Sequence, residues 1–283
     1  MSKRSGTRLR VPFLLLFASL LVACAATPQS QQLLSRPSDQ LPEGVELVDV
    51  PFFPQELFQC GPAALATILQ YNQVAVQPDE LVSHVYIPSR QGSLQVEMLA
   101  ATRTFERIPY VIPGTLTAII DELDAGNPVL VFQNLGLSVL PQWHYAVVVG
   151  FDPERQELIL RSGTIREHRV ALPVFERTWQ RAEHWAFVAL TPGDLPASAE
   201  VSDYFMAVAD YQRLHPELSG AAWQAGYQQW PDQAVIAMGY SNWLYQQGDL
   251  PRAASVLEQL LSIQPDYQPA QQNLSAIRNE MQS

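Results

Sequence analysis

The chain has 283 residues, of which 47% are hydrophobic and 16% are charged, a balance typical of globular proteins. Its formal net charge is −11. This excess of acidic side chains disfavours nucleic acid and anionic lipid headgroups as partners, because both are negatively charged. The length is sufficient for about two domains.

The N-terminal 23 residues have the features of a signal peptide. Four basic residues stand within the first ten, and an apolar run over 11–22 follows that is too short to span a bilayer comfortably. The small residue Ala23 precedes Cys24, as at a lipoprotein cleavage site. We therefore expect residues 1–23 to be removed and Cys24 to be lipidated, since two or three acyl chains anchor a protein firmly. The alternative is an uncleaved N-terminal membrane helix.

This N-terminus resembles those of Gram-negative lipoproteins, in which an aspartate after the lipidated cysteine is associated with retention at the inner membrane. Ala25 occupies that position here. The expected location is therefore the outer membrane, with the chain facing the periplasm. Removing the four basic residues of the signal from the total of 17 leaves 13 against 28 acidic residues, a net charge of −15. Residues 24–44 are rich in Gln, Ser and Pro, which predicts a flexible tether.

Cys60 is one of only two cysteines, and it lies between an extended, proline-broken stretch over 50–55 and an apolar helical pattern over 63–71. A cysteine at a helix N-terminus is expected to have a lowered pKa, because backbone N–H groups and the helix dipole favour the thiolate. If Cys24 is lipidated, Cys60 has no partner within the chain. In an oxidising compartment such a thiol is buried, paired with another chain, or kept for its reactivity.

The stretch after Cys60 predicts helices first and strands second. Short helices are expected at 78–82, 93–102 and 115–123, and strands at 128–133, 144–151, 157–162 and 185–190. This order predicts an α+β domain with an antiparallel sheet over residues 45–193.

His144 opens one of these strands, directly after a loop, where an imidazole can face a cleft. A nucleophilic cysteine needs such a base to accept its proton and later protonate the leaving group. The remaining histidines lie in polar or helical surroundings and are expected at the surface: His84, His168, His184 and His215. None has zinc-ligand spacing to Cys60, so neither a metal nor another cofactor is expected.

The segments Gln55, Cys60-Gly61-Pro62-Ala63, 126–131 and His144-Tyr145-Ala146-Val147-Val148 resemble the bacteriocin-processing double-glycine cysteine peptidases. The resemblance covers about 45–191 and implies a papain-like fold. It also implies that Cys60 attacks the carbonyl, that His144 is the base and that Gln55 stabilises the oxyanion. Gln59 is the competing oxyanion donor, although a residue adjacent to the nucleophile more naturally contributes its backbone.

The family's aspartate, followed by proline, has no evident counterpart in this chain. Asp152-Pro153 matches in composition, but Asp152 is eight positions from His144, roughly 26 Å along a strand, and is expected to be a turn residue. The equivalent position is Ser162, or Arg161 if the register slips by one. A serine accepts a hydrogen bond from the imidazole without supplying charge, so activity is expected to be low, or the acceptor to lie elsewhere, for example at Asn134.

The C-terminal part, residues 197–283, has a helical pattern with a repeat. Trp230-Pro231-Asp232 and Gln264-Pro265-Asp266 are 34 residues apart, the tetratricopeptide period. Gly248 and Asp249 fall at the expected turn between the helices of one repeat, and residues 268–281 are expected to be a capping helix. A plain helical bundle that braces the first domain is the alternative to a module that binds polypeptide.

Together these features predict a lipid-anchored cysteine peptidase of the cell envelope that hydrolyses peptide or amide bonds. The alternative is a catalytically silent papain-like adaptor that binds a polypeptide and presents it through the repeats. The same cysteine and histidine could also act on amides that are not proteins.

Overall fold

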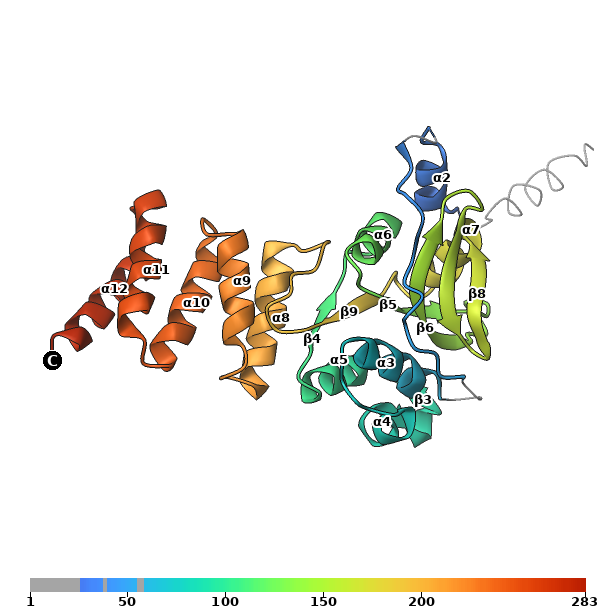
Figure 1. The fold of residues 1–283 in the computed structure, drawn as a ribbon, viewed down its shortest axis with the longest axis horizontal. Helices are drawn as coiled ribbons and strands as arrows, with labels where there is room; N and C mark the ends of the chain where they lie inside the picture. Colours follow the sequence, from blue (N-terminus) through green and yellow to red (C-terminus); the bar gives the residue numbers. More distant parts are fainter. Residues whose placement is uncertain (1–25, 38–39, 55–58) are drawn as a thin grey trace, which may run out of the picture.

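The computed structural model describes residues 26–37, 40–54 and 59–283 (Figure 1). The predicted signal peptide, Cys24 and Gln55 lie outside these residues. The molecule is elongated, with a domain built on a β-sheet at one end and a row of helices at the other. None of the helices in these described ranges combines the length and the hydropathy that a bilayer span requires.

The sheet has seven strands in the order β4-β9-β5-β6-β7-β8, with β1 pairing to β6, and every pairing in it is antiparallel. The α+β class and the antiparallel sheet are thus confirmed. The strands are β1 (Val45–Glu46), β4 (Ile108–Val111), β5 (Val129–Asn134), β6 (Trp143–Asp152), β7 (Glu157–Ser162), β8 (Ile165–Ala171) and β9 (Ala186–Leu190).

Helices cover both faces of the sheet. One face packs on α3 (Cys60–Tyr71), beyond which lie α4 (Pro78–Val85) and α5 (Gln95–Thr104). The other face packs on α6 (Leu116–Asp124) and α7 (Leu172–Gln180). The alternation of a strand is visible in β6, where Tyr145 and Val147 belong to the α3 side and Ala146 and Val148 to the other. A small hairpin, β2 (Tyr86–Ile87) and β3 (Gly92–Ser93), encloses the short 3₁₀ helix η3 (Pro88–Arg90) beside α3.

The segment predicted to be a flexible tether contains the helix α2 (Pro28–Leu34), which packs on α7. Buried Glu176 of α7 accepts hydrogen bonds from the backbone N–H groups of Gln29 (3.0 Å) and Ser30 (2.7 Å) and from the Ser30 hydroxyl (2.6 Å). The carboxylate thus satisfies N–H groups in the first turn of α2, which have no partner within the helix. The tether prediction is therefore wrong for residues 28–34.

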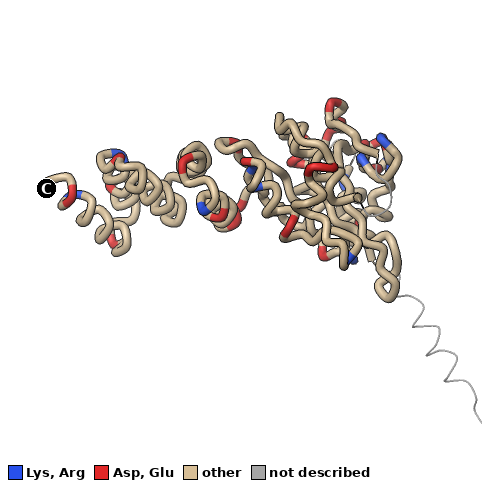
Figure 2. The backbone as a smooth tube through the Cα atoms, turned by 90° about the horizontal axis from the view of Figure 1, so that it is seen from below, with Lys and Arg blue, Asp and Glu red and all other residues tan. Residues whose placement is uncertain are grey.

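Five antiparallel helices follow the sheet domain: α8 (Val201–Leu214), α9 (Gly220–Gln229), α10 (Ala234–Gln246), α11 (Leu250–Ile263) and α12 (Gln268–Met281). Gly248, with φ +79°, forms the turn between α10 and α11, where the sequence predicted a turn. The helices join the sheet domain through α8, where Arg103 pairs with Asp210 at 3.3 Å and His215 Nε2 lies 2.7 Å from the Arg103 carbonyl oxygen. Figure 2 shows acidic positions spread over both parts of the molecule, with basic positions scattered among them.

Candidate active site

Cys60 is the first residue of α3, with Gln59 as its exposed N-cap, so the predicted position at a helix N-terminus is confirmed. The side chain is half-buried and packs against the core cluster on the α3 side of the sheet. Gly61, the next residue, is in close contact with β3. A Cβ atom there would lie 2.7 Å from Ser93 Cβ, closer than real side chains approach. The absence of a side chain at residue 61 therefore lets β3 approach the helix that carries the thiol.

His144 is the second residue of β6. It lies at the end of the sheet that contains the C-terminal ends of β5 and β7. Its Nε2 lies 2.9 Å from Ser162 Oγ at the end of β7. The β6–β7 pairing is shifted between Val148 and Gly150, and this shift contributes to the alignment of the two strand ends. Ser162 is thus the residue in contact with the imidazole, as the hairpin argument expected.

Cys60 and His144 line the same cleft, whose volume is about 910 Å³. The β2–β3 hairpin and the start of α5 form one wall, and the loop that leads into β6 forms another. Residues 181–183, which follow α7, complete the lining of the cleft. The lining residues with aromatic or charged side chains are Arg90, Phe132, Trp143, Tyr145, Arg181 and Glu183.

Burial controls the protonation of both candidate groups. It raises the pKa of the Cys60 thiol, and the backbone N–H groups of Tyr145, Gly61 and Cys60 only partly offset this shift by stabilising the thiolate. Burial likewise lowers the pKa of His144 to about 4, with a smaller contribution from the nearby His168 imidazole. The expected lowering of the Cys60 pKa is therefore wrong, because desolvation outweighs the helix terminus. At neutral pH the cleft holds a neutral thiol and a neutral imidazole.

The other residues considered as partners of His144 are engaged elsewhere. Asn134 Oδ1 accepts hydrogen bonds from the backbone N–H groups of Gly136 (3.0 Å) and Gln142 (2.9 Å), so this side chain holds the loop before β6. Arg161 is buried and donates to the carbonyl oxygens of Val50 (3.3 Å) and Arg166 (2.7 Å). Neither side chain has a hydrogen bond to His144 among the contacts of the described residues.

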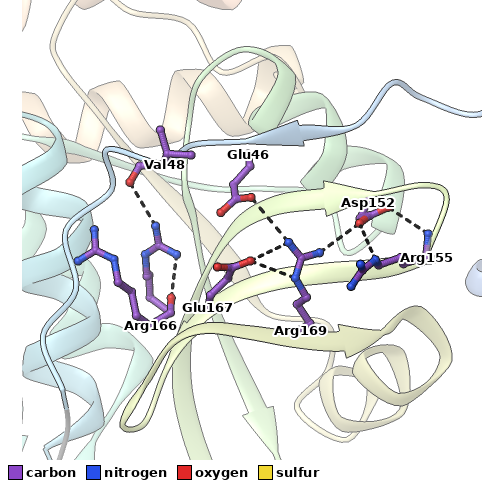
Figure 3. A network of polar contacts seen from close by, with 8 residues as sticks. Glu46, Val48, Asp152, Arg155, Arg166, Glu167 and Arg169 are labelled. Atoms are coloured by element: carbon purple, nitrogen blue, oxygen red, sulfur yellow. Dashed lines mark hydrogen bonds and ion pairs between the residues drawn. The ribbon is translucent and has the colours of Figure 1, made fainter.

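Asp152 is the last residue of β6, directly before the turn to β7, so the turn that the sequence predicted there begins one position later. It accepts a hydrogen bond from the Arg155 backbone N–H at 3.0 Å and pairs with Arg169 at 3.1 Å. Figure 3 shows Arg169 reaching Glu46, Asp152 and Glu167. This network connects β1, β6 and β8, and it belongs to the opposite end of β6 from His144.

Sequence reasoning missed the aromatic wall of the cleft. Phe132 stacks on Trp143 with ring centroids 5.1 Å apart and contacts Tyr145 at 4.5 Å. Phe132 and Tyr145 are partners in neighbouring strands, so their proximity depends on a pairing that the sequence does not reveal. It also missed Ser93, whose buried hydroxyl lies against Gly61 and has no hydrogen-bond partner among the residues that the structure describes.

No group of three or more His, Cys, Asp or Glu side chains within 26–37, 40–54 and 59–283 is placed to hold a metal ion. Among the described residues, the cleft brings together a thiol, an imidazole and a serine hydroxyl in contact with that imidazole.

Residues 47–186 match the model of the Peptidase_C39 like family. No curated protein matches the chain. Among solved structures, a C39-like peptidase from Bacillus anthracis is 17% identical, with a TM-score of 0.45, over 53% of this chain and 98% of the other. The peptidase domain of Streptococcus ComA, a bifunctional ABC transporter of a quorum-sensing pathway, is 20% identical, with a TM-score of 0.41, over 50% and 98%.

A double glycine motif protease from an AMS/PCAT transporter, solved in complex with the leader peptide, is 19% identical, with a TM-score of 0.38, over 50% of this chain and 91% of the other. The sheet domain of this chain, with Cys60 and His144 in one cleft, thus lies within the segment that matches the family model. Residues 47–186 match the Peptidase_C39 like family, which supports a hydrolase of the cysteine peptidase type.

Proposed function

We propose that the chain hydrolyses amide bonds in polypeptides, with Cys60 as the nucleophile, His144 as the general base and Ser162 as the residue that orients the imidazole. The observation that carries this proposal is the shared cleft of Cys60 and His144, with His144 Nε2 held 2.9 Å from Ser162 Oγ. A nucleophile beside a base that is itself oriented by a third group is the general arrangement for covalent catalysis.

The hydrogen bond to Ser162 leaves Nδ1 as the ring nitrogen available to the thiol. With Nε2–H donating to the serine oxygen, neutral Nδ1 accepts the Cys60 proton as sulfur attacks the carbonyl carbon. Backbone N–H groups at the start of α3, together with Gln55 by family resemblance, stabilise the oxyanion. The imidazolium then protonates the leaving amine, and water hydrolyses the thioester to release the acid and restore the thiol.

A silent adaptor is the second candidate, and two observations favour it. The group in contact with His144 is a neutral hydroxyl in place of a carboxylate, and burial raises the pKa of Cys60. Both reduce the fraction of the reactive thiolate–imidazolium pair. In this role the cleft binds a polypeptide without cleaving it.

The remaining parts of the proposal concern location and partners. Lipidation at Cys24 anchors the chain to the outer membrane, facing the periplasm. Helices α8–α12 act as tetratricopeptide-like repeats, supported by the 34-residue spacing of Pro231 and Pro265 at the turns before α10 and α12. The partner at this module and at the cleft is a polypeptide.

The test is hydrolysis of an unfolded protein by the purified full chain, with new N-termini read by mass spectrometry. Wild type is expected to cleave, whereas Cys60→Ala and His144→Ala are expected to be inactive but folded. A matched control is His84→Ala, which removes a histidine of α4 that does not line the cleft. Binding of the same substrate by both wild type and Cys60→Ala, without cleavage by either, would establish the adaptor.

A further inference from the structure

The loop between β5 and β6, residues 135–142, presents apolar side chains to solvent; we call it the apolar loop. Leu137 is 66% exposed, Val139 89% and Leu140 75%. The loop contains no charged residue. Adjacent large aliphatic side chains at this exposure are unusual on a soluble surface and mark a place of contact with another apolar surface.

The backbone of the apolar loop is held rigidly by hydrogen bonds. Leu137 and Leu140 exchange backbone hydrogen bonds at 3.2 and 3.0 Å. The Arg181 guanidinium donates to the carbonyl oxygens of Asn134 (2.8 Å) and Gly136 (2.6 Å), and the Leu135 N–H donates to the Gln142 carbonyl at 2.8 Å. These bonds satisfy backbone polar groups on both sides of the tip, which lowers the cost of moving the loop into an apolar medium.

The exposed tip is separate from the cleft. Pro141, Gln142 and Trp143 line the cleft, whereas residues 135–140 do not. A substrate-binding pocket is concave and covers its apolar side chains in part. The tip instead protrudes, with Val139 almost wholly exposed, which fits insertion into a soft, flat surface better than recognition of a single peptide.

The N-terminal end of α2 lies at the same end of the sheet as the apolar loop. The Gln29 side chain donates to the Gly114 carbonyl at 3.0 Å and accepts from the Leu116 N–H at 2.7 Å. Gly114 in turn packs on His184, three residues after the Arg181 that holds the loop. A Cβ atom at Gly114 would lie 2.9 Å from His184 Cβ.

This geometry limits the distance between the sheet domain and a lipid on Cys24. Because α2 begins at Pro28 and is docked on α7, only four residue steps separate Cys24 from the folded domain. Four extended residues span roughly 14 Å at most. The end of the sheet that carries the apolar loop is thus held within reach of the bilayer to which Cys24 would be attached.

We propose that the apolar loop inserts into the membrane surface beside the lipid anchor and holds the mouth of the cleft against it. The occupant of this surface is the bilayer itself, and the proposal rests on the proposed lipidation of Cys24. Insertion is driven by apolar burial, because the loop is uncharged and the chain is acidic. Neutral lipids are therefore bound better than anionic ones. Trp143, 52% exposed at the base of the loop, has the amphipathic side chain typical of the membrane–water interface.

The test uses the full lipidated chain reconstituted in phosphatidylcholine vesicles. In a Cys60→Ser background the only free thiol is introduced by Val139→Cys and labelled with an environment-sensitive fluorophore. The matched control carries the label at Met281→Cys, an exposed position on α12. We expect a blue shift and quenching by spin-labelled lipid at residue 139, and neither change at residue 281. Ser138→Cys provides a second label position if the residue 139 variant folds poorly.

A companion variant combines Leu137→Glu and Leu140→Glu with the label at Ser138→Cys. We expect neither the blue shift nor the quenching by spin-labelled lipid in this variant. When made with Cys60 intact, it should still hydrolyse a soluble substrate at the wild-type rate. The proposal is overturned if the loop label stays in water while the chain is anchored. It is also overturned if the label shifts only on addition of unfolded polypeptide, which would make the loop a substrate-binding element. Release of Cys24→Ala from the membrane fraction tests the anchor separately, and hydrolysis of soluble substrate tests the peptidase proposal separately.

Discussion

His144 Nε2 lies 2.9 Å from Ser162 Oγ, so the group that contacts the imidazole is a neutral hydroxyl at the end of the neighbouring strand. A hydroxyl fixes the ring orientation but adds no charge to stabilise imidazolium. Burial, with a smaller contribution from His168, lowers the pKa of His144, and the Ser162 hydroxyl supplies no charge to oppose this shift.

Replacing Ser162 with Asp is expected to raise the pKa of His144 from about 4 toward its ordinary value, because a nearby negative charge favours the imidazolium. Since a charge-assisted hydrogen bond is about twice as strong as a neutral one, kcat/KM for peptide hydrolysis should rise about tenfold. Ser162→Ala should lower kcat/KM about fivefold, for the loss of about 1 kcal/mol.

The matched control for this charge is Ser162→Asn, which is similar in shape to Asp but neutral. It should leave the His144 titration, followed by NMR, near that of wild type. If Asp and Asn at residue 162 shift the pKa of His144 equally, the missing negative charge does not account for the low pKa of the imidazole.

The alkylation of Cys60 by iodoacetamide is expected to keep accelerating above pH 9, because burial raises the pKa of the thiol above its ordinary value of about 8.5. Gly61→Ala is not a suitable control, since it alters the local packing; denatured wild type provides the reference thiol. A folded-state midpoint below that of the denatured chain would contradict the dominance of burial.

The raised pKa of Cys60 is expected to lower the stability of the folded chain at alkaline pH. As pH rises past about 8.5, the unfolded chain loses the Cys60 proton before the folded chain does, so folding becomes less favourable. Cys60→Ala should remove this part of the alkaline decline in the free energy of unfolding, measured by denaturant titration at pH 7.5 and pH 10.

Gly61→Ala is expected to destabilise the domain by about 1–3 kcal/mol, a typical cost of overpacking. The new Cβ would lie 2.7 Å from Ser93 Cβ, and this clash outweighs the higher helix propensity of Ala. Adding Ser93→Gly removes the atom that clashes and should recover most of the loss. Urea unfolding of the two single variants and the double variant measures this coupling, and a double variant no more stable than Gly61→Ala would show that the strain lies elsewhere.

The main strands could be predicted because β5, β6, β7 and β9 are apolar runs buried within the sheet. The strand β8 was missed, since it is an edge strand whose residues 166–169 are polar and none of them is fully buried. Cys60, His144 and Ser162 were found from a motif and from hairpin register. The raised pKa of Cys60 could not be predicted from the sequence, because it depends on burial by residues distant in sequence.

The helix α2 was missed for a related reason. Seven residues are too few to form a stable helix alone, and Pro28–Leu34 has little apolar periodicity. Its stability comes from Glu176, which is 146 positions away from Ser30. Composition alone therefore predicted a tether where a long-range contact makes a docked helix.

Glu176→Gln is expected to release α2 from the domain. The amide keeps one acceptor oxygen but places an NH₂ group where the other oxygen was, so either the hydrogen bond from Gln29 or the two from Ser30 are lost. Loss of buried hydrogen bonds to a charged group costs about 1.5–3 kcal/mol each. Hydrogen exchange of the backbone amides in 28–34 should accelerate, while that of β5 and β6 stays unchanged. Glu154→Gln, at an exposed turn, is the control and should change neither. Protection of 28–34 equal to wild type would show that Glu176 does not hold α2, and the short reach between Cys24 and the sheet domain would then lose its support.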